Sequence, residues 1–595
     1  MKKRLFSNYI LGITLVINSF ITQVVAQTQV GQDVDGEAAS DTSGRSVSLS
    51  SNGNILAVGA TDNDGNGSNS GQVRVFENVN DVWTQIGDDI DGEEAGFKSG
   101  RSISLSGDGT RVAIGGSNSG QVRVFERSSN TWIQLGQDID EEAGDETIRN
   151  VKFSQDGTTL VVGAWTDVVN TVNAGRARVY RLDNTNNWVQ LGADIYGESE
   201  GDAAGSISIN GDGTIIAIGA QGNDGNGNRA GHARVFQWTN NTNWVQLGQD
   251  LDGEEPGDAF GNKLALNASG TIIAMGAEFH DASGNPGDYY GQVRVFEWDG
   301  NGSWVQKGSE IIGDRYSQSG HSLTINAEGN ILAIGAPSDN NGAGSGAGYV
   351  RLYKWDDEDT QWRRIGSEIR GERALDGAGS SVALNSDGSL VAVGATGNDD
   401  NGNRSGNTRV FSVDVISPLG YSVSIDQSLI EPSNETNVSF TFINAEIGTS
   451  YMYSFSSSGD GNIDTINGSG TISQSNETVS GIDLSSLLEG TITLRVRLID
   501  PTGNRGTYVT STVLKDDLLS TQEFDAFRIA VYPNPTNGEI VVNTKVNHID
   551  VYNLLGQKVF ETEQNRFDIS FLESGVYLIK IATDLGSLEK KISRR

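Results

Sequence analysis

Three loops of this chain carry the spacing of carboxylate and amide side chains that is typical of calcium-binding loops. They read Asp62-Asn-Asp-Gly-Asn-Gly67, Asn223-Asp-Gly-Asn-Gly-Asn228 and Asn398-Asp-Asp-Asn-Gly-Asn403. In the first loop, alternate oxygen ligands precede a glycine, but Val73 stands where a bidentate glutamate would complete the site. Hydrogen-bonded Asx turns in solvated loops are the alternative. The candidate ligands for calcium, the one cofactor that the sequence suggests, are Asp62, Asp64, Asn66, Asp224 and Asp399.

The remaining chemically capable residues do not form a catalytic set. The four histidines are far apart and out of register between repeats, so we expect surface or loop positions for them; they are His232, His280, His321 and His548. Gly197-Glu-Ser-Glu-Gly201 spells a nucleophile elbow but lacks the strand-to-helix setting that exposes such a serine. Carboxylate pairs recur from repeat to repeat, whereas an active site breaks the symmetry. The sequence therefore predicts that the protein is not an enzyme.

An internal repeat positions these residues. A turn with an Asp-Gly or equivalent pair occurs seven times, 48 to 59 residues apart, at Gly53, Gly109, Gly157, Gly213, Gly270, Gly329 and Gly388. Each unit has four strand signals, which in the first unit are Ser46-Val-Ser-Leu-Ser50, Ala57-Val-Gly-Ala60, Val73-Arg-Val-Phe76 and a run that begins at Trp83. Seven units of four antiparallel strands predict an all-β chain that begins with a seven-bladed β-propeller.

The chain ends of the propeller are expected to meet. The seventh unit stops after Phe411 without its tryptophan strand, and the missing text stands near the N-terminus, where Thr28–Glu37 matches Thr84–Glu93. The N-terminal strand is therefore predicted to complete the last blade, which removes an open sheet edge. The loops between the second and third strands and those between successive units then share one face, and we expect that face to be acidic.

Tryptophans fall into two groups. Trp83 and its five equivalents occupy a fixed repeat position, which predicts packing between blades. Trp165, Trp238, Trp298 and Trp355 are less regular, and sugar stacking is the alternative for them.

At these residues the chain resembles the FG-GAP family of propeller repeats over about residues 28–415. The matching text is Gly-x-Ser-Val-x-Leu, Ala-Ile-Gly-Ala and Gly-x-Val-Arg-Val-Phe, and the Phe-Gly pair is intact at Phe260-Gly261. Calcium-binding members carry Asp-x-Asp-x-Asp-Gly between the first two strands. This chain has a shortened turn there, such as Ser-Gly-Asp-Gly, so the calcium sites of the family are not carried over.

Composition and the N-terminus indicate an exported protein. Lys+Arg 42 against Asp+Glu 77 gives a net charge of −35, which disfavours nucleic acid and anionic lipid as partners. Cysteine is absent, so disulfides and thiolate sites are excluded. Residues 1–26 have a basic start, an apolar run and small residues at Val24-Val-Ala26, which predicts a secretory signal peptide. No later segment is apolar enough to span a membrane. We expect residues 27–415 to form the propeller.

After the propeller the repeat period stops. Residues 416–515 show about seven strand-like runs, and Leu484-Ser-Ser-Leu487, Gly490-Thr-Ile-Thr-Leu494 and Asp500-Pro-Thr-Gly-Asn504 resemble bacterial Ig-like modules. This predicts an Ig-like β-sandwich that serves as a spacer. Residues 516–528 read as a polar linker.

Residues 529–595 resemble the type A C-terminal sorting domain of the type IX secretion system. The motifs are Val531-Tyr-Pro-Asn-Pro-Thr-Asn-Gly538, Val551-Tyr-Asn-Leu-Leu-Gly-Gln-Lys-Val559 and Gly575-Val-Tyr-Leu-Ile-Lys-Ile581, before a basic end. The resemblance implies a small β-sandwich that the outer-membrane machinery recognises, usually before cleavage, on a route through the periplasm to the cell surface or medium. We therefore expect a non-catalytic adhesion protein whose propeller loops bind an extracellular glycan or protein. A secreted propeller hydrolase acting on glycans or peptides and a structural coat protein are the alternatives.

Overall fold

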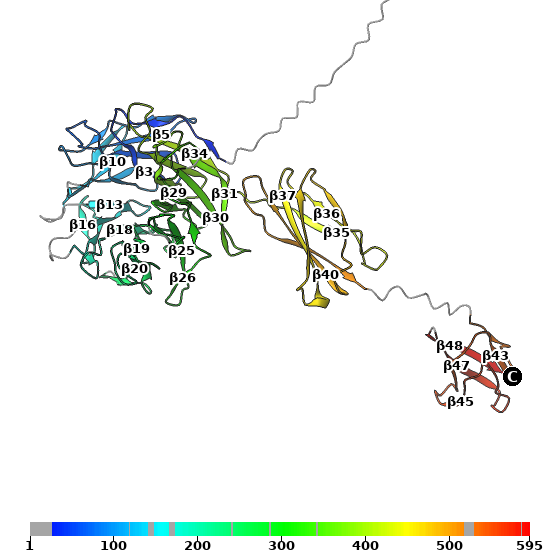
Figure 1. The fold of residues 1–595 in the computed structure, drawn as a ribbon. Coiled ribbons are helices and arrows are strands. Elements are labelled where there is room, and N and C mark those ends of the chain that lie inside the picture. The colour runs from blue at the N-terminus through cyan, green and yellow to red at the C-terminus, as the bar shows by residue number, and fades with distance from the viewer. Residues whose placement is uncertain are drawn as a thin grey trace, which may run out of the picture.

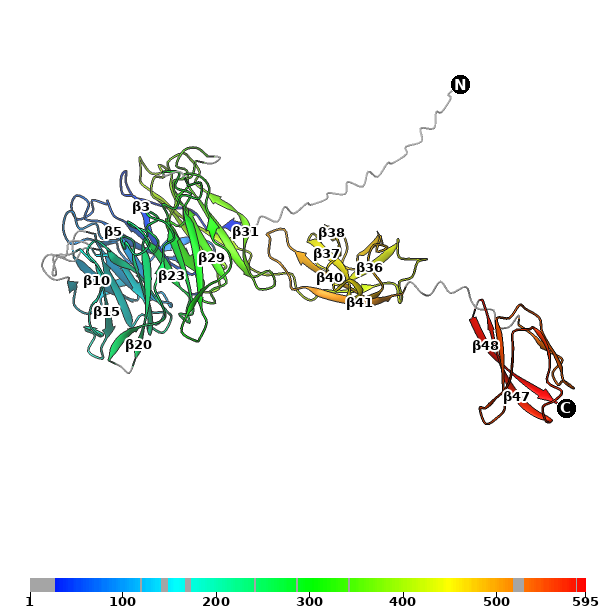
Figure 2. The same ribbon diagram turned by 60° about the horizontal axis from the view of Figure 1, so that its bottom comes forward.

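The computed structural model describes residues 27–117, 120–140, 148–165, 173–239, 242–284, 287–340, 343–516, 529–584 and 586–595. The expected signal peptide and nearly all of the expected linker lie outside these residues. The described chain is all-β apart from a short 3-10 helix at Ser458–Asp460. Figures 1 and 2 show a large ring of sheets, then a β-sandwich beside β31, then a small C-terminal domain.

Residues 27–413 form seven antiparallel sheets among the described residues, each with four main strands, A to D. The strands follow one another in sequence order except in the last blade, where the N-terminal β1 is strand D. Strands A are β3 (Ser43–Leu49), β8 (Ser102–Leu105), β13 (Ile148–Phe153), β18 (Ala204–Ile209), β23 (Lys263–Leu266), β28 (Ser322–Ile325) and β32 (Ala378–Leu384). Strands B are β4 (Ile55–Ala60), β9 (Arg111–Gly115), β14 (Thr159–Ala164), β19 (Ile215–Ala220), β24 (Ile272–Ala277), β29 (Ile331–Ala336) and β33 (Leu390–Ala395).

Strands C and D complete each blade. Strands C are β5 (Gln72–Asn78), β10 (Gln121–Ser128), β15 (Arg176–Leu182), β20 (His232–Thr239), β25 (Gln292–Trp298), β30 (Tyr349–Asp356) and β34 (Asn407–Val413). Strands D are β6 (Trp83–Gln85), β11 (Thr131–Gln134), β16 (Trp188–Gln190), β21 (Asn243–Gln246), β26 (Trp304–Gln306), β31 (Gln361–Arg370) and β1 (Gln27–Gln29). Short pairs continue most of these D strands, at β7 (Ile90–Asp91), β12 (Ile139–Asp140), β17 (Ile195–Tyr196), β22 (Leu251–Asp252), β27 (Ile311–Ile312) and β2 (Val34–Asp35).

The N-terminal strand belongs to the last blade. β1 pairs antiparallel with β34, with Gln27 opposite Val413 and Gln29 opposite Phe411. β2 continues the same pairing, with Val34 opposite Thr408. The first and last described strands of the propeller are therefore joined by backbone hydrogen bonds, and the ring has no free edge there.

A second closure runs around the tight turns between strands A and B. Each turn donates one backbone N–H to a carbonyl of the next blade's turn, over N···O distances of 2.7–3.1 Å. The donors in order are Ser51, Gly107, Gln155, Gly211, Ala268, Ala327 and Ser386, and Ser386 donates back to Ser51. Seven turns thus form a closed hydrogen-bonded circle that narrows this end of the central channel.

Neighbouring blades are held by small residues and by tryptophan. A Cβ on Gly59 would lie 2.2 Å from the carbonyl oxygen of Gly100 in the next blade, which explains the small-residue text of strand B. The indole of Trp83 is 3% exposed and donates to the carbonyl of Val30, at 2.9 Å. The indoles of its five equivalents make the corresponding bond to the preceding blade, at 2.8–3.0 Å. These six tryptophans therefore pack between blades.

The β-sandwich after the propeller consists of a three-stranded and a four-stranded sheet. The first contains β35 (Ser422–Ile425), β36 (Val438–Ile443) and β39 (Thr478–Ile482). The second contains β37 (Ser450–Ser457), β38 (Thr465–Thr471), β40 (Gly490–Ile499) and β41 (Val509–Lys515). Phe440, Phe442 and Phe455 are completely buried between the two sheets.

The sandwich contacts the sixth blade through buried charge. Arg497 of β40 is almost fully buried and pairs with Asp356 at 3.0 Å and with Asp359 at 2.5 Å, both on the propeller. A backbone bond of 2.6 Å runs from Gly366 of β31 to Thr502. The ion pairs fix the register of the two surfaces, since separating them would leave Arg497 without its partners.

The C-terminal domain has the same two-sheet plan on a smaller scale. One sheet contains β42 (Val531–Tyr532), β43 (Glu539–Val542) and β46 (Arg566–Asp568). The other contains β44 (His548–Tyr552), β45 (Lys558–Thr562), β47 (Gly575–Thr583) and β48 (Gly586–Arg594). Ile540, Ile549 and Ile579 are completely buried in its core. The tyrosine and glycine motifs of the tail therefore frame a folded unit.

Candidate ligand site in the central channel

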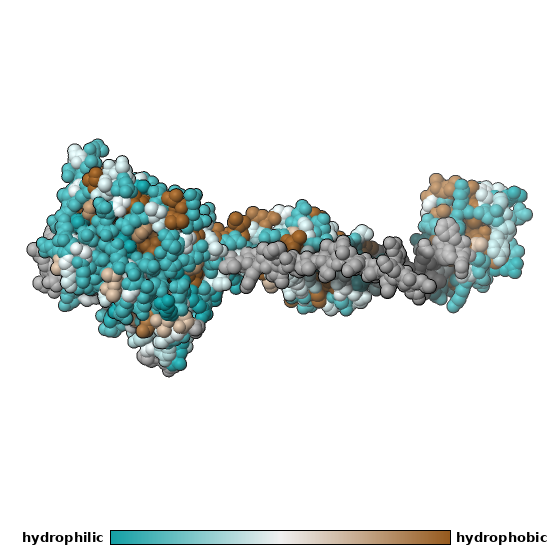
Figure 3. Space-filling model, turned by 90° about the horizontal axis from the view of Figure 1, so that it is seen from above, coloured by the Kyte–Doolittle hydropathy of each residue, from teal (hydrophilic) through white to brown (hydrophobic). Residues whose placement is uncertain are grey.

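The loops with predicted calcium ligands lie on the face opposite the circle of turns, where the B–C and D–A loops meet. Asn66 donates to the carbonyls of Gly92 and Glu93 at 3.0 Å, which ties the two loop types together. The same bond recurs at Asn226 and Asn401. We call the ring of these loops the rim. Seen from above, the propeller surface is predominantly hydrophilic (Figure 3).

The predicted calcium ligands bond to their own loops or to a neighbouring loop. Asp64 accepts the backbone N–H of Asn69, and Asp224 and Asp399 accept the equivalent N–H, each at 2.7 Å. Asp62 pairs with Lys98 at 2.9 Å. In the described part of the chain, sets of three potential metal ligands with atoms within 4.8 Å occur elsewhere, and none contains these aspartates. Asx turns occur in the same three loops at the neighbouring Asn63, Asn223 and Asn398, each of which accepts the backbone N–H two residues on. Calcium binding by these loops stays a prediction.

The expectation of surface or loop positions for the histidines is wrong for His232, which lies buried on β20, while His280 lies in the loop after β24 but is buried there. His232 is 2% exposed, and burial lowers the pKa of its imidazole. It takes the strand position that Gln72 and Gln292 occupy in other blades, where the amide bonds to glutamates. His280 is also buried, and its hydrogen bond of 3.0 Å to Asp258 raises its pKa. The spacing of the histidines could not predict their burial, because burial depends on the position within the repeat and not on the residue type.

The central channel widens from the circle of turns into a cup. Strands A of all seven blades line a cavity of about 330 Å³, and we call this cavity the cup. Its floor is an apolar collar with one side chain per blade, formed by Leu49, Leu105, Phe153, Ile209, Leu266, Ile325 and Leu384. Above the collar, most of the wall-lining polar positions of strand A carry serine, threonine or asparagine. The cup is therefore polar, and it is narrowed below by the collar and the circle of turns.

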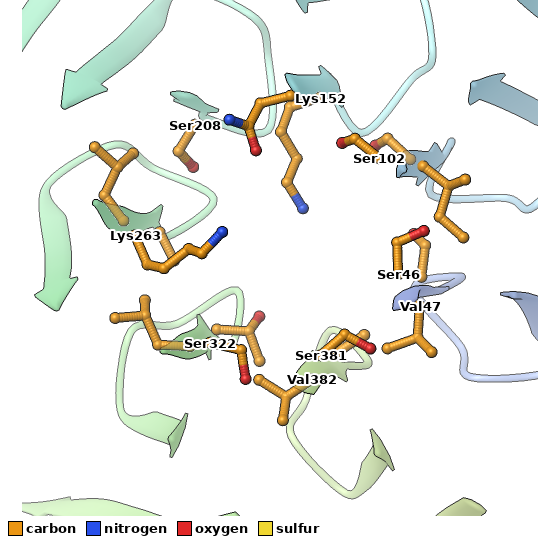
Figure 4. Close-up of a pocket in the computed structure, with 18 of the residues that line it drawn as sticks. Ser46, Val47, Ser102, Lys152, Ser208, Lys263, Ser322, Ser381 and Val382 are labelled. Atoms are coloured by element: carbon orange, nitrogen blue, oxygen red, sulfur yellow. The ribbon is translucent and has the colours of Figure 1, made fainter. Parts of the chain in front are cut away.

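Two lysines break the sevenfold pattern of the cup. Lys152 lies opposite Val161 on strand B, at the register position that Ser48, Ser104 and Ser208 hold in their blades. Lys263 lies opposite Gly276, as Ser46 lies opposite Gly59. Figure 4 shows both side chains extending toward the centre of the cavity. The symmetry is thus broken by cationic groups.

The protein environment disfavours the protonated, charged form of both lysines. Burial, together with the nearby Arg101, Arg45 and Lys152 charges, lowers the pKa of Lys263 to about 8, although Glu278 acts in the opposite direction. Desolvation by the enclosing walls of the cup also lowers the pKa of Lys152, although its side chain is exposed to the channel. Within the described residues neither lysine has a hydrogen bond or an ion pair, and the lining of the cup contains no Asp or Glu. Two positive charges therefore face the same solvent-accessible space, and the carboxylate that acts on Lys263, Glu278, lies at the mouth without forming an ion pair with it.

The mouth of the cup is asymmetric as well. Arg45 and Arg101 line it on the side of the first two blades. On the other side, Glu278 accepts a hydrogen bond from Asn262 and lies 2.5 Å from Nδ1 of His321. His321 holds the register position of Arg45, since each directly precedes a serine, Ser322 or Ser46, that lies opposite a strand B glycine. A carboxylate and an imidazole thus meet at the mouth, which the spacing of the histidines did not indicate.

The four irregular tryptophans have two different environments in the structure. Trp238, Trp298 and Trp355 pack on the neighbouring Trp244, Trp304 and Trp362, with ring centroids 5.3–5.6 Å apart. Trp165 instead lines the mouth. A Cβ on Gly205 would lie 2.2 Å from Cδ1 of Trp165, so the glycine at this repeat position makes room for the indole.

Sequence reasoning missed the lysines, although a signal was present. Aligning strand A of the seven repeats gives columns of Ser, Ala, Thr and Asn in which Lys152 and Lys263 each stand out. The alternation of strand A shows that both columns face away from the blade core. The pattern could not show that both lysines, from different register positions of strand A, extend into the same cavity.

Comparisons with known proteins place the C-terminal domain in a family. Residues 530–594 match the family model described as the secretion system C-terminal sorting domain. A search of curated proteins finds none that matches this chain. Within the described residues, no helix is both long and apolar enough to cross a bilayer.

Solved structures of similar shape are propeller-like. Hydrazine synthase from Kuenenia stuttgartiensis is 14% identical with a TM-score of 0.43, and the match covers 65% of this chain and 99% of that one. The periplasmic gluconolactonase of Pseudomonas aeruginosa is 15% identical with a TM-score of 0.38, covering 55% and 85%. A putative 6-phosphogluconolactonase from Bacteroides uniformis is 10% identical with a TM-score of 0.41, covering 55% and 85%. Likenesses this distant say nothing about activity.

The match of the C-terminal domain to its family, in contrast to these distant likenesses, is specific. The match spans the folded two-sheet domain and includes the motifs at both of its ends. The C-terminal domain therefore belongs to the secretion-system sorting domains, and it marks the chain as cargo of the type IX secretion system, delivered to the cell surface or the extracellular space.

Proposed function

We propose that this exported protein is a non-catalytic binding protein whose ligand enters the propeller from the rim side and is held in the cup. The FG-GAP-type propeller is the binding module, and the Ig-like sandwich is the spacer that carries it. The observation that supports this assignment is the break in symmetry: rim contacts repeat from blade to blade, whereas Lys152, Lys263, Trp165 and Glu278 each occur at one blade. Ligand sites are concave and combine a few convergent polar groups.

An array of glycans and matrix proteins tests this function. The full chain is applied with calcium and again with chelator, and saturable binding in both conditions is expected if the cup is the site. Binding that chelator abolishes would move the site to the rim loops and to the calcium ligands predicted there. The absence of saturable binding to any array member would contradict the binding function and favour a structural coat.

A second candidate function is hydrolysis of a glycan or peptide. The Glu278–His321 contact at the mouth favours it, because a carboxylate that orients an imidazole is a common arrangement for general acid–base chemistry. A screen of chromogenic glycosides and peptides, run in parallel with His321→Gln, tests this function. Turnover that the variant loses would establish the hydrolase in place of the binding protein.

A further inference from the structure

The cup has a charge opposite to that of the protein around it. The chain carries a net charge of −35, yet the charged residues lining the cup are Arg45, Arg101, Lys152 and Lys263. A narrow cavity lined by charges of one sign concentrates the field, because its walls exclude much of the solvent that would screen them. Anions that are repelled by the outer surface therefore meet an attractive potential inside the cup.

The serines of the cup fall into two sets. Ser46, Ser206, Ser322 and Ser381 donate their hydroxyl protons to backbone carbonyls, whereas a second set keeps a proton that can be donated to a ligand. Ser48, Ser102, Ser104 and Ser208 each accept a backbone N–H from the next blade, at 3.0 Å. Among the described residues these four hydroxyls have no hydrogen-bond acceptor, so their protons remain available to a ligand. Hydroxyl and ammonium donors from five of the seven blades favour a ligand that is rich in acceptor oxygens.

The shape of the cup limits the ligand to something small or to the end of a chain. The apolar collar and the hydrogen-bonded circle of turns narrow the lower end, so the wide approach is from the rim. A volume of about 330 Å³ suits one sugar-sized group. The indole of Trp165 lines the mouth and gives it an aromatic group that can contact the next part of a ligand outward.

We propose that the cup binds an oxyanion-bearing ligand of sugar size, such as an acidic saccharide residue, end-on, with its anionic group between Lys152 and Lys263. This inference rests on the proposed binding function and names its ligand class. The two ammonium groups supply the charge, and the serine hydroxyls bond to the remaining oxygens. Charge-assisted hydrogen bonds of this kind are about twice as strong as neutral ones.

A matched pair of sugars tests the proposal by calorimetric titration of the full chain at low salt. Galacturonate and galactose share their ring hydroxyls and differ in the carboxylate at C6. We expect galacturonate to bind at least about tenfold more tightly than galactose, which is the scale of one charge-assisted bond. Inorganic phosphate is the third probe. If phosphate binds as tightly as galacturonate, the ligand class is oxyanions in general, and if it binds more weakly, the class is acidic sugars.

The variants for this test use residues that the repeats already place at these positions. Lys152→Ser combined with Lys263→Ser should remove the preference for galacturonate, whereas Lys580→Ser, an exposed lysine of the sorting domain, should leave it unchanged. Equal affinity for the two sugars in the unaltered chain, or an unchanged preference in the double variant, would overturn the oxyanion proposal. If neutral ligands on the array still bind in that case, the binding function stands; if nothing binds, both proposals fall.

Discussion

The rim and the cup are built from the same repeat, yet they use their polar residues in opposite ways. At the rim, acidic and amide side chains repeat from blade to blade and satisfy backbone groups of the loops, as Asp41 and Asp202 do. In the cup, small residues are replaced at two positions by lysines that have no ion pair or hydrogen bond among the described residues. Repetition with satisfied partners indicates a structural role, whereas a single unsatisfied substitution indicates a ligand.

Reversing the charge of the cup should give the largest effect. Lys152→Glu with Lys263→Glu replaces two attractive charges by two repulsive ones, so affinity for galacturonate should fall at least about a hundredfold. Titration calorimetry measures this loss, and the melting temperature of the variant shows whether it is folded. A folded variant that binds galacturonate as tightly as the unaltered chain would contradict ligand binding by the cup lysines.

Removing a rim carboxylate should affect stability and leave binding unchanged. Asp41 is 3% exposed and accepts the backbone N–H groups of Glu37 at 3.1 Å and Ala38 at 2.8 Å. Asp41→Ala leaves these donors unpaired and should lower the free energy of unfolding by about 2–3 kcal/mol. Asp202→Ala in the fourth blade is the matched variant and should cost the same. Loss of galacturonate affinity in either variant would assign ligand binding to the rim.

The pH dependence of binding should report the cup lysine. The pKa of Lys263 is about 8 in the protein without ligand, and only its protonated form attracts an anion. Affinity for galacturonate should therefore be highest below pH 8 and fall as pH rises through about 8, by up to about tenfold per pH unit. Lys263→Ser should flatten this profile between pH 7 and 9. A profile in the variant that matches the unaltered chain would exclude Lys263 from the site.

Calcium should give the smallest effect. The carboxylates of Asp64, Asp224 and Asp399 already accept backbone N–H groups, so adding calcium or chelator should change the melting temperature by less than about 1 °C. Differential scanning calorimetry measures this shift, with Asp64→Asn as the comparison variant. A clear rise with calcium that Asp64→Asn abolishes would restore these loops as cation sites.

Much of the propeller could be anticipated from the sequence because its determinants are local and repeated. The turn glycines, the alternation of strand A and the small residues of strand B act within one unit or between adjacent units. The duplicated text at Thr28–Glu37 indicated that β1 would pair with the seventh sheet, and β1 pairs with β34. The tail motifs identified the sorting domain, and residues 530–594 match that family.

The cup could not be anticipated in the same way, because it is assembled from residues that are distant in sequence. Lys152 and Lys263 are separated by two blade units, and Glu278 meets His321 across a blade boundary. Spacing along the chain carries no information about such contacts. The sequence also favoured the acidic rim as the site, because repeated acidic loops are conspicuous in a sequence and a single lysine in a strand is not.

The most direct test of this account is a parallel binding measurement on three forms of the full chain. The unaltered chain, the Lys152→Ser/Lys263→Ser variant and the Asp64→Asn/Asp399→Asn variant are titrated with the strongest ligand from the array. The account predicts that the cup variant loses binding and that the rim variant binds like the unaltered chain. Loss of binding in the rim variant with normal binding in the cup variant would contradict it.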